Sequence, residues 1–219
     1  MNGFRLLSTK VLSPNQRMRL VNNGVSYSEW NFIQIIPKTF KADISNKVLL
    51  FTSQNAVNAV LSQIDLRDQK CYCVGEKTKS ILVKNGAKVL KMEQNASILA
   101  DFVLKNAENE DFLFFAGNLR MPHLEAAFSK ANIPLEVITV YETISHPKKM
   151  GFFDGILFFS PSGVDSFLTS NSVALSQCFA IGSTTAIALK PHTNNIITAS
   201  KPSVEHLTAA VKTHLTTIL

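Results

Sequence analysis

The 219-residue sequence has little of what marks several large classes of protein. Only 9 residues are glycine and only 17% are charged, which argues against collagen-like, low-complexity and disordered chains. No apolar run approaches the ~18–20 residues that cross a bilayer, and residues 1–10 lack the apolar stretch of a signal peptide. We therefore expect a globular, cytoplasmic protein with no membrane partner.

Cysteine is also scarce. Cys71, Cys73 and Cys178 are an odd number in apolar surroundings, which argues against a disulfide framework and favours a reducing compartment. Cys71 and Cys73 could form half of a metal site, but no second pair and no cluster of histidines accompanies them. We expect two small buried side chains on a strand, and no metal ion.

The motifs of the common cofactors and nucleophiles are missing as well. The sequence has no G-x-G-x-x-G dinucleotide fingerprint and no G-x-x-x-x-G-K-[ST] phosphate loop. It also has no H-E-x-x-H zinc motif and no G-x-S-x-G nucleophile elbow. We therefore expect a site that works without a cofactor.

The charge is basic, with 22 lysines and arginines against 16 acidic residues, or +6. This balance favours an anionic partner without choosing its kind. The lysines are spread along the chain and not interleaved with aromatic residues, as they would be on a single-strand nucleic-acid platform. We expect no nucleic-acid partner; steep salt dependence of such binding would support the opposite view.

An internal repeat is the most informative feature. Phe51–Val57 resembles Phe158–Val164 at an offset of 107, from Ser160 minus Ser53, and the same offset relates Cys71 to Cys178. More weakly, Phe4–Leu7 falls opposite Phe112–Phe115, at an offset of 108. Two similar units of about half the chain each are the simplest interpretation.

Each unit alternates short apolar runs with helical periodicity. The runs are rich in β-branched and aromatic residues, which predicts buried strands. They are Val48–Phe51, Cys71–Val74, Phe112–Phe115, Val137–Tyr141, Ile156–Phe159 and Cys178–Ile181. Apolar residues at i, i+3, i+4 follow them, as in Val57, Val60 and Leu61, and predict helices lying on a sheet. The fold class is therefore α/β, with two similar doubly wound, mostly parallel sheets.

The ends of these runs carry small polar residues and glycine. Ser53 and Ser160 suit helix N-caps, Pro161 suits a first helical turn and Gly86 suits a helix stop. Ligands of parallel sheets bind at the carboxyl ends of the strands, where helix N-termini attract anions. Any one such residue could simply be a turn or cap, but their presence on both repeats favours a binding cleft.

Six motifs occur in an order that resembles the uroporphyrinogen-III synthase family. They are Leu50–Val57, Val74–Thr78, Phe115–Asn118, Val140–Thr143, Phe158–Gly163 and Ala180–Ala186. The resemblance extends from about Val48 to Val211, whereas Met1–Phe40 matches poorly.

The resemblance implies two flavodoxin-like domains joined by two extended crossings, with a cleft between them. The first domain would be discontinuous, residues 1–34 with 146–219, and the second would be residues 38–142. The linkers would lie near residues 35–37 and 143–145, where Pro37 and Pro147 favour extended backbone before them.

The family's reaction is the closure of linear hydroxymethylbilane to uroporphyrinogen III, with inversion of the last pyrrole ring and release of water, in haem biosynthesis. The resemblance thus implies a cofactor-independent, cyclising lyase with a polycarboxylate tetrapyrrole substrate. Tyr141 matches the family's catalytic tyrosine within Val-Tyr-x-Thr, and a protonated phenol can donate a hydrogen bond to the departing oxygen. The alternative is a strand tyrosine whose hydroxyl merely reaches water.

The resemblance also implies the residues that hold the carboxylates, through backbone N–H and hydroxyl groups. They are Thr52, Ser53, Gly75, Gly117, Asn118, Ser160, Ser162, Gly163, Gly182, Ser183, Thr184 and Thr185. Arg120, just past Asn118, could add a bidentate clamp or be a solvated helix-start arginine. We expect a monomer. The competing hypothesis is a non-catalytic, two-domain protein that binds a small anion.

Overall fold

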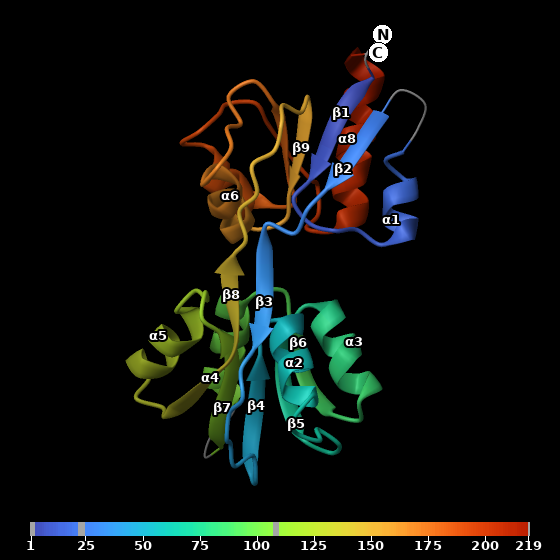
Figure 1. Cartoon of the computed structure of the whole chain (residues 1–219). Coiled ribbons are helices and arrows are strands. Elements are labelled where there is room, and N and C mark those ends of the chain that lie inside the picture. Colours follow the sequence, from blue (N-terminus) through green and yellow to red (C-terminus); the bar gives the residue numbers. More distant parts are fainter. Residues whose placement is uncertain (1–2, 22–24, 107–109, 219) are drawn as a thin grey trace. The chain divides into compact units, whose positions relative to one another are not determined.

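The computed structural model describes residues 3–21, 25–106 and 110–218. The chain divides into two compact units, which are considered separately (Figure 1). Unit 1 is Met1–Gln34 with Ile144–Leu219, and unit 2 is Ile35–Thr143. Each unit holds a mostly parallel sheet with helices on both of its faces. The predicted α/β class with two sheets is confirmed.

Unit 1 contains a five-stranded sheet in the order β11-β10-β9-β1-β2, and all its pairings are parallel. Its strands are β1 (Phe4–Ser8), β2 (Val25–Glu29), β9 (Gly155–Phe158), β10 (Gln177–Ala180) and β11 (Ile196–Thr198). Its helices are α1 (Pro14–Met18), α6 (Pro161–Leu168), α7 (Ser183–Leu189) and α8 (Val204–Ile218). Val164 and Phe167 of α6 pack on one face, and Leu207 and Val211 of α8 pack on the other.

Unit 2 holds the sheet β3-β8-β7-β4-β5-β6, apart from the first two residues of β3 and the last two of β8, which the division assigns to unit 1. Its strands are β3 (Ile33–Pro37), β4 (Lys47–Phe51), β5 (Lys70–Val74), β6 (Lys88–Glu93), β7 (Asp111–Gly117) and β8 (Leu135–Ser145). Its helices are α2 (Gln54–Leu61), α3 (Glu76–Lys84), α4 (Ala96–Asn106) and α5 (His123–Lys130). Helices α2 and α3 cover one face, and α4 and α5 cover the other. The pairings from β8 to β6 are parallel, whereas the edge strand β3 runs opposite to β8 (Figure 1).

Local signals placed the helix ends correctly. Ser53 caps α2 by accepting a hydrogen bond from the Asn55 N–H, at 3.1 Å. Ser160 caps α6 in the same way, by accepting from the Gly163 N–H at 3.1 Å. Gly86 follows α3 with φ of 82°, a left-handed conformation that favours glycine.

The repeat is visible in the strand orders. Reading β11-β10-β9-β1-β2 beside β6-β5-β4-β7-β8 aligns every strand of unit 1 with a strand of unit 2. Leu6 pairs with Gly155, and Phe112 pairs with Val48, which stands 107 residues before Gly155. Leu6 therefore corresponds to Phe112, an offset of 112 minus 6, or 106. The expected offset of 108 for this segment is wrong by two residues, because apolar strand residues match one another at several registers.

All three cysteines are free and fully buried, as expected of small apolar side chains. Burial raises the pKa of the Cys71 and Cys178 thiols to about 12 and that of Cys73 to about 11. Among the described residues, no three His, Cys, Asp or Glu side chains gather as metal ligands would. Nor does the described part of the chain include a helix long and apolar enough to cross a membrane.

Candidate active site

Tyr141 of β8 lies at the carboxyl edge of the unit 2 sheet, opposite Gly117, the last residue of β7. Its hydroxyl donates a hydrogen bond to Oγ of Ser53, 3.1 Å away, and its side chain is 7% exposed. Ser53 Oγ also accepts from the Asn55 N–H, so one oxygen both caps α2 and receives the phenol. The two residues are 88 apart in sequence, and the order β8-β7-β4 places their strand ends at the same edge.

Gly117 and Asn118 complete this corner of unit 2. A Cβ at Gly117 would lie 2.4 Å from Cζ of Tyr141, so the ring occupies the space that any side chain there would need. The Asn118 N–H donates to the Tyr141 carbonyl at 3.2 Å, and its Oδ1 accepts from the Thr143 N–H at 2.8 Å. The structure thus brings Tyr141, Ser53, Gly117 and Asn118 together.

Arg120 is engaged within the protein. Its Nε donates to Oε1 of Glu125, and its Nη1 donates to the Gly117 carbonyl at 3.1 Å. These bonds turn the guanidinium toward the β7–α5 loop and α5, and its charge is matched by a carboxylate. A bidentate clamp on a substrate carboxylate stays a prediction, and it would require Arg120 to exchange Glu125 for the substrate.

Thr52 and Gly75 follow β4 and β5 at the same edge. Gly75 has φ of 83°, and no atom lies within 4 Å of the position a Cβ would take, so this turn is open to solvent. Its own N–H donates to the Glu93 carbonyl at 2.9 Å and is therefore committed. Thr52 is half-buried beside Ser53.

Unit 1 presents a second group of expected residues at the corresponding edge. Ser160 Oγ lies 3.1 Å from Ser162 Oγ and accepts from the Gly163 N–H. A Cβ at Gly163 would lie 3.3 Å from Ser160 Oγ and 3.9 Å from Thr9 Oγ1. The structure therefore brings Ser160, Ser162 and Gly163 together. Thr9, which the motifs missed, lies beside them, but its side chain is buried and its hydroxyl donates to the Leu157 carbonyl at 2.8 Å. Thr9 directly follows β1, and the weak Phe4–Leu7 repeat was the only sequence signal for that strand end.

The turn after β10 begins at Gly182 and leads into α7. Ser183 and Thr184 are exposed in its first turn, where N–H groups lack helical partners. Thr185 is only 1% exposed. Its side chain faces the interior, so its expected contact with a carboxylate stays a prediction for its backbone N–H in the first turn of α7.

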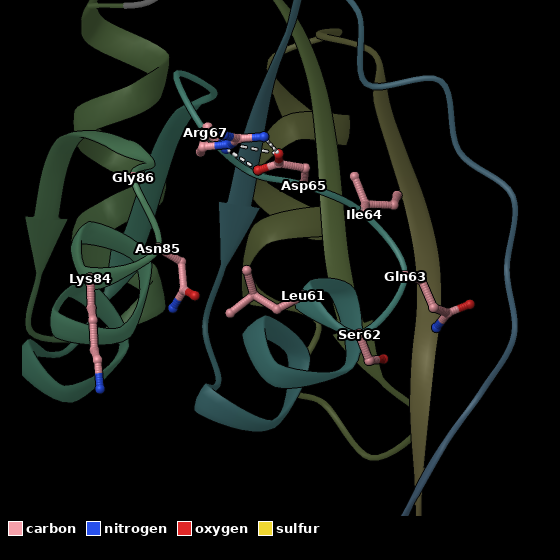
Figure 2. A pocket seen from close by; sticks show the side chains of 9 residues that line it. All are labelled: Leu61, Ser62, Gln63, Ile64, Asp65, Arg67, Lys84, Asn85 and Gly86. Carbon is pink, nitrogen blue, oxygen red and sulfur yellow. Dashed lines mark hydrogen bonds and ion pairs between the residues drawn. The ribbon is translucent and has the colours of Figure 1, made fainter.

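A hollow of about 650 Å³ lies elsewhere in unit 2, at the carboxyl ends of α2 and α3 (Figure 2). Its lining includes Leu61, Gln63 and Asn85. Asp65 and Arg67 also line it and form an ion pair with one another. Helices α2 and α3 run back from the edge that holds Ser53 and Tyr141, so the hollow opens at the opposite edge of the sheet.

Comparison with known proteins adds an independent finding. A family model described as uroporphyrinogen-III synthase HemD matches residues 18–209. The solved uroporphyrinogen-III synthetase of Helicobacter pylori is similar with a TM-score of 0.72 and 16% identity, covering 98% of this chain and 99% of that one. A mutant uroporphyrinogen III synthase of the extremely thermophilic bacterium Thermus thermophilus is similar with a TM-score of 0.67 and 12% identity, covering 99% of each chain. These structures share the fold, and the family model spans most of the sequence: the chain belongs to the uroporphyrinogen-III synthase family of enzymes.

Proposed function

We propose that the protein converts linear hydroxymethylbilane to uroporphyrinogen III, inverting the last pyrrole ring and releasing water, in haem biosynthesis. The observation that carries this proposal is the family match over residues 18–209. The phenol at the carboxyl edge of the unit 2 sheet supports it, since that edge is where parallel sheets place their ligands.

The bilane carries many carboxylates, and the chain offers means of holding them. Its formal charge is +6, and helix N-termini with neighbouring hydroxyls stand at the strand ends of both units. The groups that we propose for binding are the side chains of Thr52, Ser53, Ser160, Ser162, Ser183 and Thr184 and the backbone N–H groups of Gly182 and Thr185. The N–H groups of Gly75 and Gly163 are engaged within the protein, so we propose that these two glycines shape their turns. Ser183 and Thr184 are exposed, as contact with a ligand requires.

We assign the proton that the leaving hydroxyl needs to Tyr141. The bond between the hydroxymethyl carbon and its oxygen breaks, electrons of the adjacent pyrrole stabilise the carbon, and the phenol proton passes to the oxygen, which leaves as water. Inversion of the last ring requires that the freed carbon bond to the α-carbon of that ring that already carries a methylene bridge. The bond from this α-carbon to its old methylene then breaks, and that methylene, stabilised by its own pyrrole, bonds to the free α-carbon of the last ring. The proton lost from that free α-carbon restores the balance. Without substrate, the phenol donates its hydrogen bond to Ser53 Oγ, 3.1 Å away, and in the reaction the departing oxygen replaces Ser53 as the acceptor.

The finer proposals follow the same chemistry. Electron-rich pyrroles supply their own reactivity, so positioning and charge placement suffice, and we propose a cofactor-independent cyclising lyase acting as a monomer. Three buried, free thiols support a reducing compartment such as the cytoplasm.

The test supplies purified protein with enzymatically generated hydroxymethylbilane and separates the porphyrin isomers after oxidation. We expect the type III isomer to predominate over the type I isomer that forms without an enzyme. Type I alone would overturn the proposal. Tight binding of the bilane without turnover would favour an anion-binding protein instead.

A further inference from the structure

The corner around Tyr141 begins with an irregularity in β8. Ala116 of β7 lies opposite Thr139, whereas Gly117 lies opposite Tyr141, so Val140 is an extra residue in β8. The Val140 carbonyl is not left unpaired, because it accepts a hydrogen bond from the Lys38 N–H at 2.8 Å. Such a bulge re-aims the side chains that follow it.

The bulge decides which face of the sheet Tyr141 joins. Val137 packs on the α4/α5 face and Ile138 on the α2/α3 face, as alternation along a strand requires. Val140 and Tyr141 are neighbours, yet both belong to the α2/α3 cluster. Regular alternation would direct Tyr141 to the opposite face, away from Ser53. The extra residue therefore makes the bond from the phenol to Ser53 possible.

Gly117 supplies the space for the ring. Its missing Cβ would lie 2.4 Å from Cζ, 2.6 Å from Cε2 and 2.7 Å from the hydroxyl oxygen of Tyr141. The phenol ring thus lies across the end of β7, in contact with backbone. Even a methyl group at Gly117 would displace both the ring and the hydroxyl.

Asn118 binds the backbone of β8 at Tyr141 and at Thr143. Its main-chain N–H donates to the Tyr141 carbonyl at 3.2 Å. Its side-chain Oδ1 accepts from the Thr143 N–H at 2.8 Å, and its Nδ2 donates to the Thr143 carbonyl at 3.4 Å. The amide side chain imitates a strand residue and extends the β7–β8 ladder beyond the end of β7. Both polar atoms of the side chain are used in doing so.

We propose that Gly117 and Asn118 are positioning residues that hold the Tyr141 phenol against Ser53, and that they do not bind substrate carboxylates. This inference rests on the proposed function, in which the phenol is the proton donor. Loss of either residue should lower kcat by no more than removal of the Tyr141 hydroxyl itself does.

Asn118 offers a direct discrimination between positioning and binding. Asn118→Asp keeps the acceptor for the Thr143 N–H, loses the longer bond from Nδ2 to the Thr143 carbonyl and places a negative charge at this position. If Asn118 positions Tyr141, kcat falls about tenfold in Asn118→Ala and only about threefold in Asn118→Asp, with KM unchanged in both. If Asn118 binds a carboxylate, Asn118→Asp raises KM more than Asn118→Ala does, which would overturn the proposal.

The role of Gly117 is tested by asking whether the effect of Gly117→Ala on kcat requires the Tyr141 hydroxyl. Gly117→Ala should lower kcat about 100-fold, because a displacement near 1 Å costs that much in a positioned reaction. In a Tyr141→Phe background the same substitution should cost less than about threefold, since the donor is already gone. Equal losses in both backgrounds would contradict a role through Tyr141. Gly151→Ala is the matched control, because a Cβ there meets only Arg5 Nη2 at 3.4 Å.

A readout without turnover separates this inference from the proposed function. The chain has three tyrosines, so ring-labelled tyrosine gives three NMR signals that Tyr→Phe variants assign. The Tyr141 signal should move in Gly117→Ala and Asn118→Ala and stay in place in Gly151→Ala. An unmoved signal would overturn the positioning role. Wild-type protein that yields only the type I isomer would instead overturn the proposed function, whatever the signals show.

Discussion

Units 1 and 2 share a strand order but carry different side chains at the ends of equivalent strands. In unit 2, Ser53 at the end of β4 receives the hydroxyl of Tyr141 from β8. In unit 1, the equivalent Ser160 at the end of β9 faces Ser162 instead. Strand β2 corresponds to β8 but ends at Glu29, which accepts from the Leu12 N–H and binds Arg17. A capping serine thus occurs at this position in both units, whereas the tyrosine that bonds to it belongs to unit 2.

The close-packed glycines differ in the same way. Gly155 in unit 1 leaves room for Phe4 and Leu6, with Phe4 Cε1 2.8 Å from the place of its absent Cβ. Gly117 in unit 2 leaves room for the Tyr141 ring. Both glycines permit a close approach, but one serves an apolar core and the other serves the candidate donor. Loss of the first should affect stability, and loss of the second should affect catalysis.

The largest contrast should come from removing the hydroxyl of Tyr141. Tyr141→Phe should lower kcat for the type III isomer by about 10²–10⁴-fold, the range for a lost general acid. Tyr27→Phe is the matched control in unit 1, because the Tyr27 hydroxyl donates to Glu29 and belongs to the other unit's framework. Steady-state rates on the bilane measure both. A Tyr141→Phe variant with the wild-type rate would exclude a general-acid role.

Gly155→Ala should destabilise unit 1 by about 1–3 kcal/mol, the usual cost of overfilling a core. Trp30 is the single tryptophan and lies in unit 1, so its fluorescence in a urea titration follows that unit. The urea concentration at the midpoint of the Trp30 fluorescence change, the Trp30 midpoint, should fall in Gly155→Ala and stay near the wild-type value in Gly151→Ala. An unchanged midpoint in Gly155→Ala would mean that Phe4 moves aside at no cost.

Replacing each of the two capping serines by alanine should affect the stability of one unit in one case and the catalytic rate in the other. Loss of either cap costs about 1 kcal/mol of helix stabilisation, but only Ser160→Ala should lower the Trp30 midpoint. Ser53→Ala should lower kcat about three- to tenfold, because the phenol loses its partner. If Ser160→Ala lowered kcat by more than Ser53→Ala, the assignment of the donor to unit 2 would be wrong.

The smallest effect near neutral pH concerns the thiols, Cys178 in unit 1 and Cys71 and Cys73 in unit 2. Their raised pKa values, about 11–12, mean that folding favours the protonated forms. This contribution to stability is complete below the unfolded pKa of about 8.5 and falls as the pH rises above it, by about 1.4 kcal/mol per pH unit for each thiol.

A chromogenic thiol reagent checks this expectation at pH 8, where native protein should react far more slowly than protein in urea. Peptide mapping then shows whether Cys178 reacts at the same denaturant concentration as Cys71 and Cys73. Fast labelling of the native chain would contradict the burial of these side chains.

Patterns local in sequence predicted much of this molecule. Four- and five-residue apolar runs marked strands such as β4 and β9, and Ser53 and Ser160 marked the helix starts, because strand burial and capping depend on a few neighbouring residues. The offset of 107 also revealed that two similar sheets exist.

The site depends on contacts that no local pattern encodes. A bulge at Val140 arises from the pairing of β7 with β8, and it places Tyr141 on the face of the sheet that holds Ser53. The ion pair that engages Arg120 likewise needs the turn of the loop toward Glu125. Thr185 resembled Thr184 in sequence, yet the helix phase of α7 turns one inward and leaves the other exposed.

The strand order has a consequence for how the chain is made. Strand β1 lies between β9 and β2, so one of its edges waits for a partner about 150 residues later in the sequence. The stretch from Ile35 to Thr143 is continuous and holds nearly all of its own sheet. On a translating ribosome, unit 2 can thus assemble while one edge of β1 is still unpaired, and an unpaired strand edge is prone to wrong pairing.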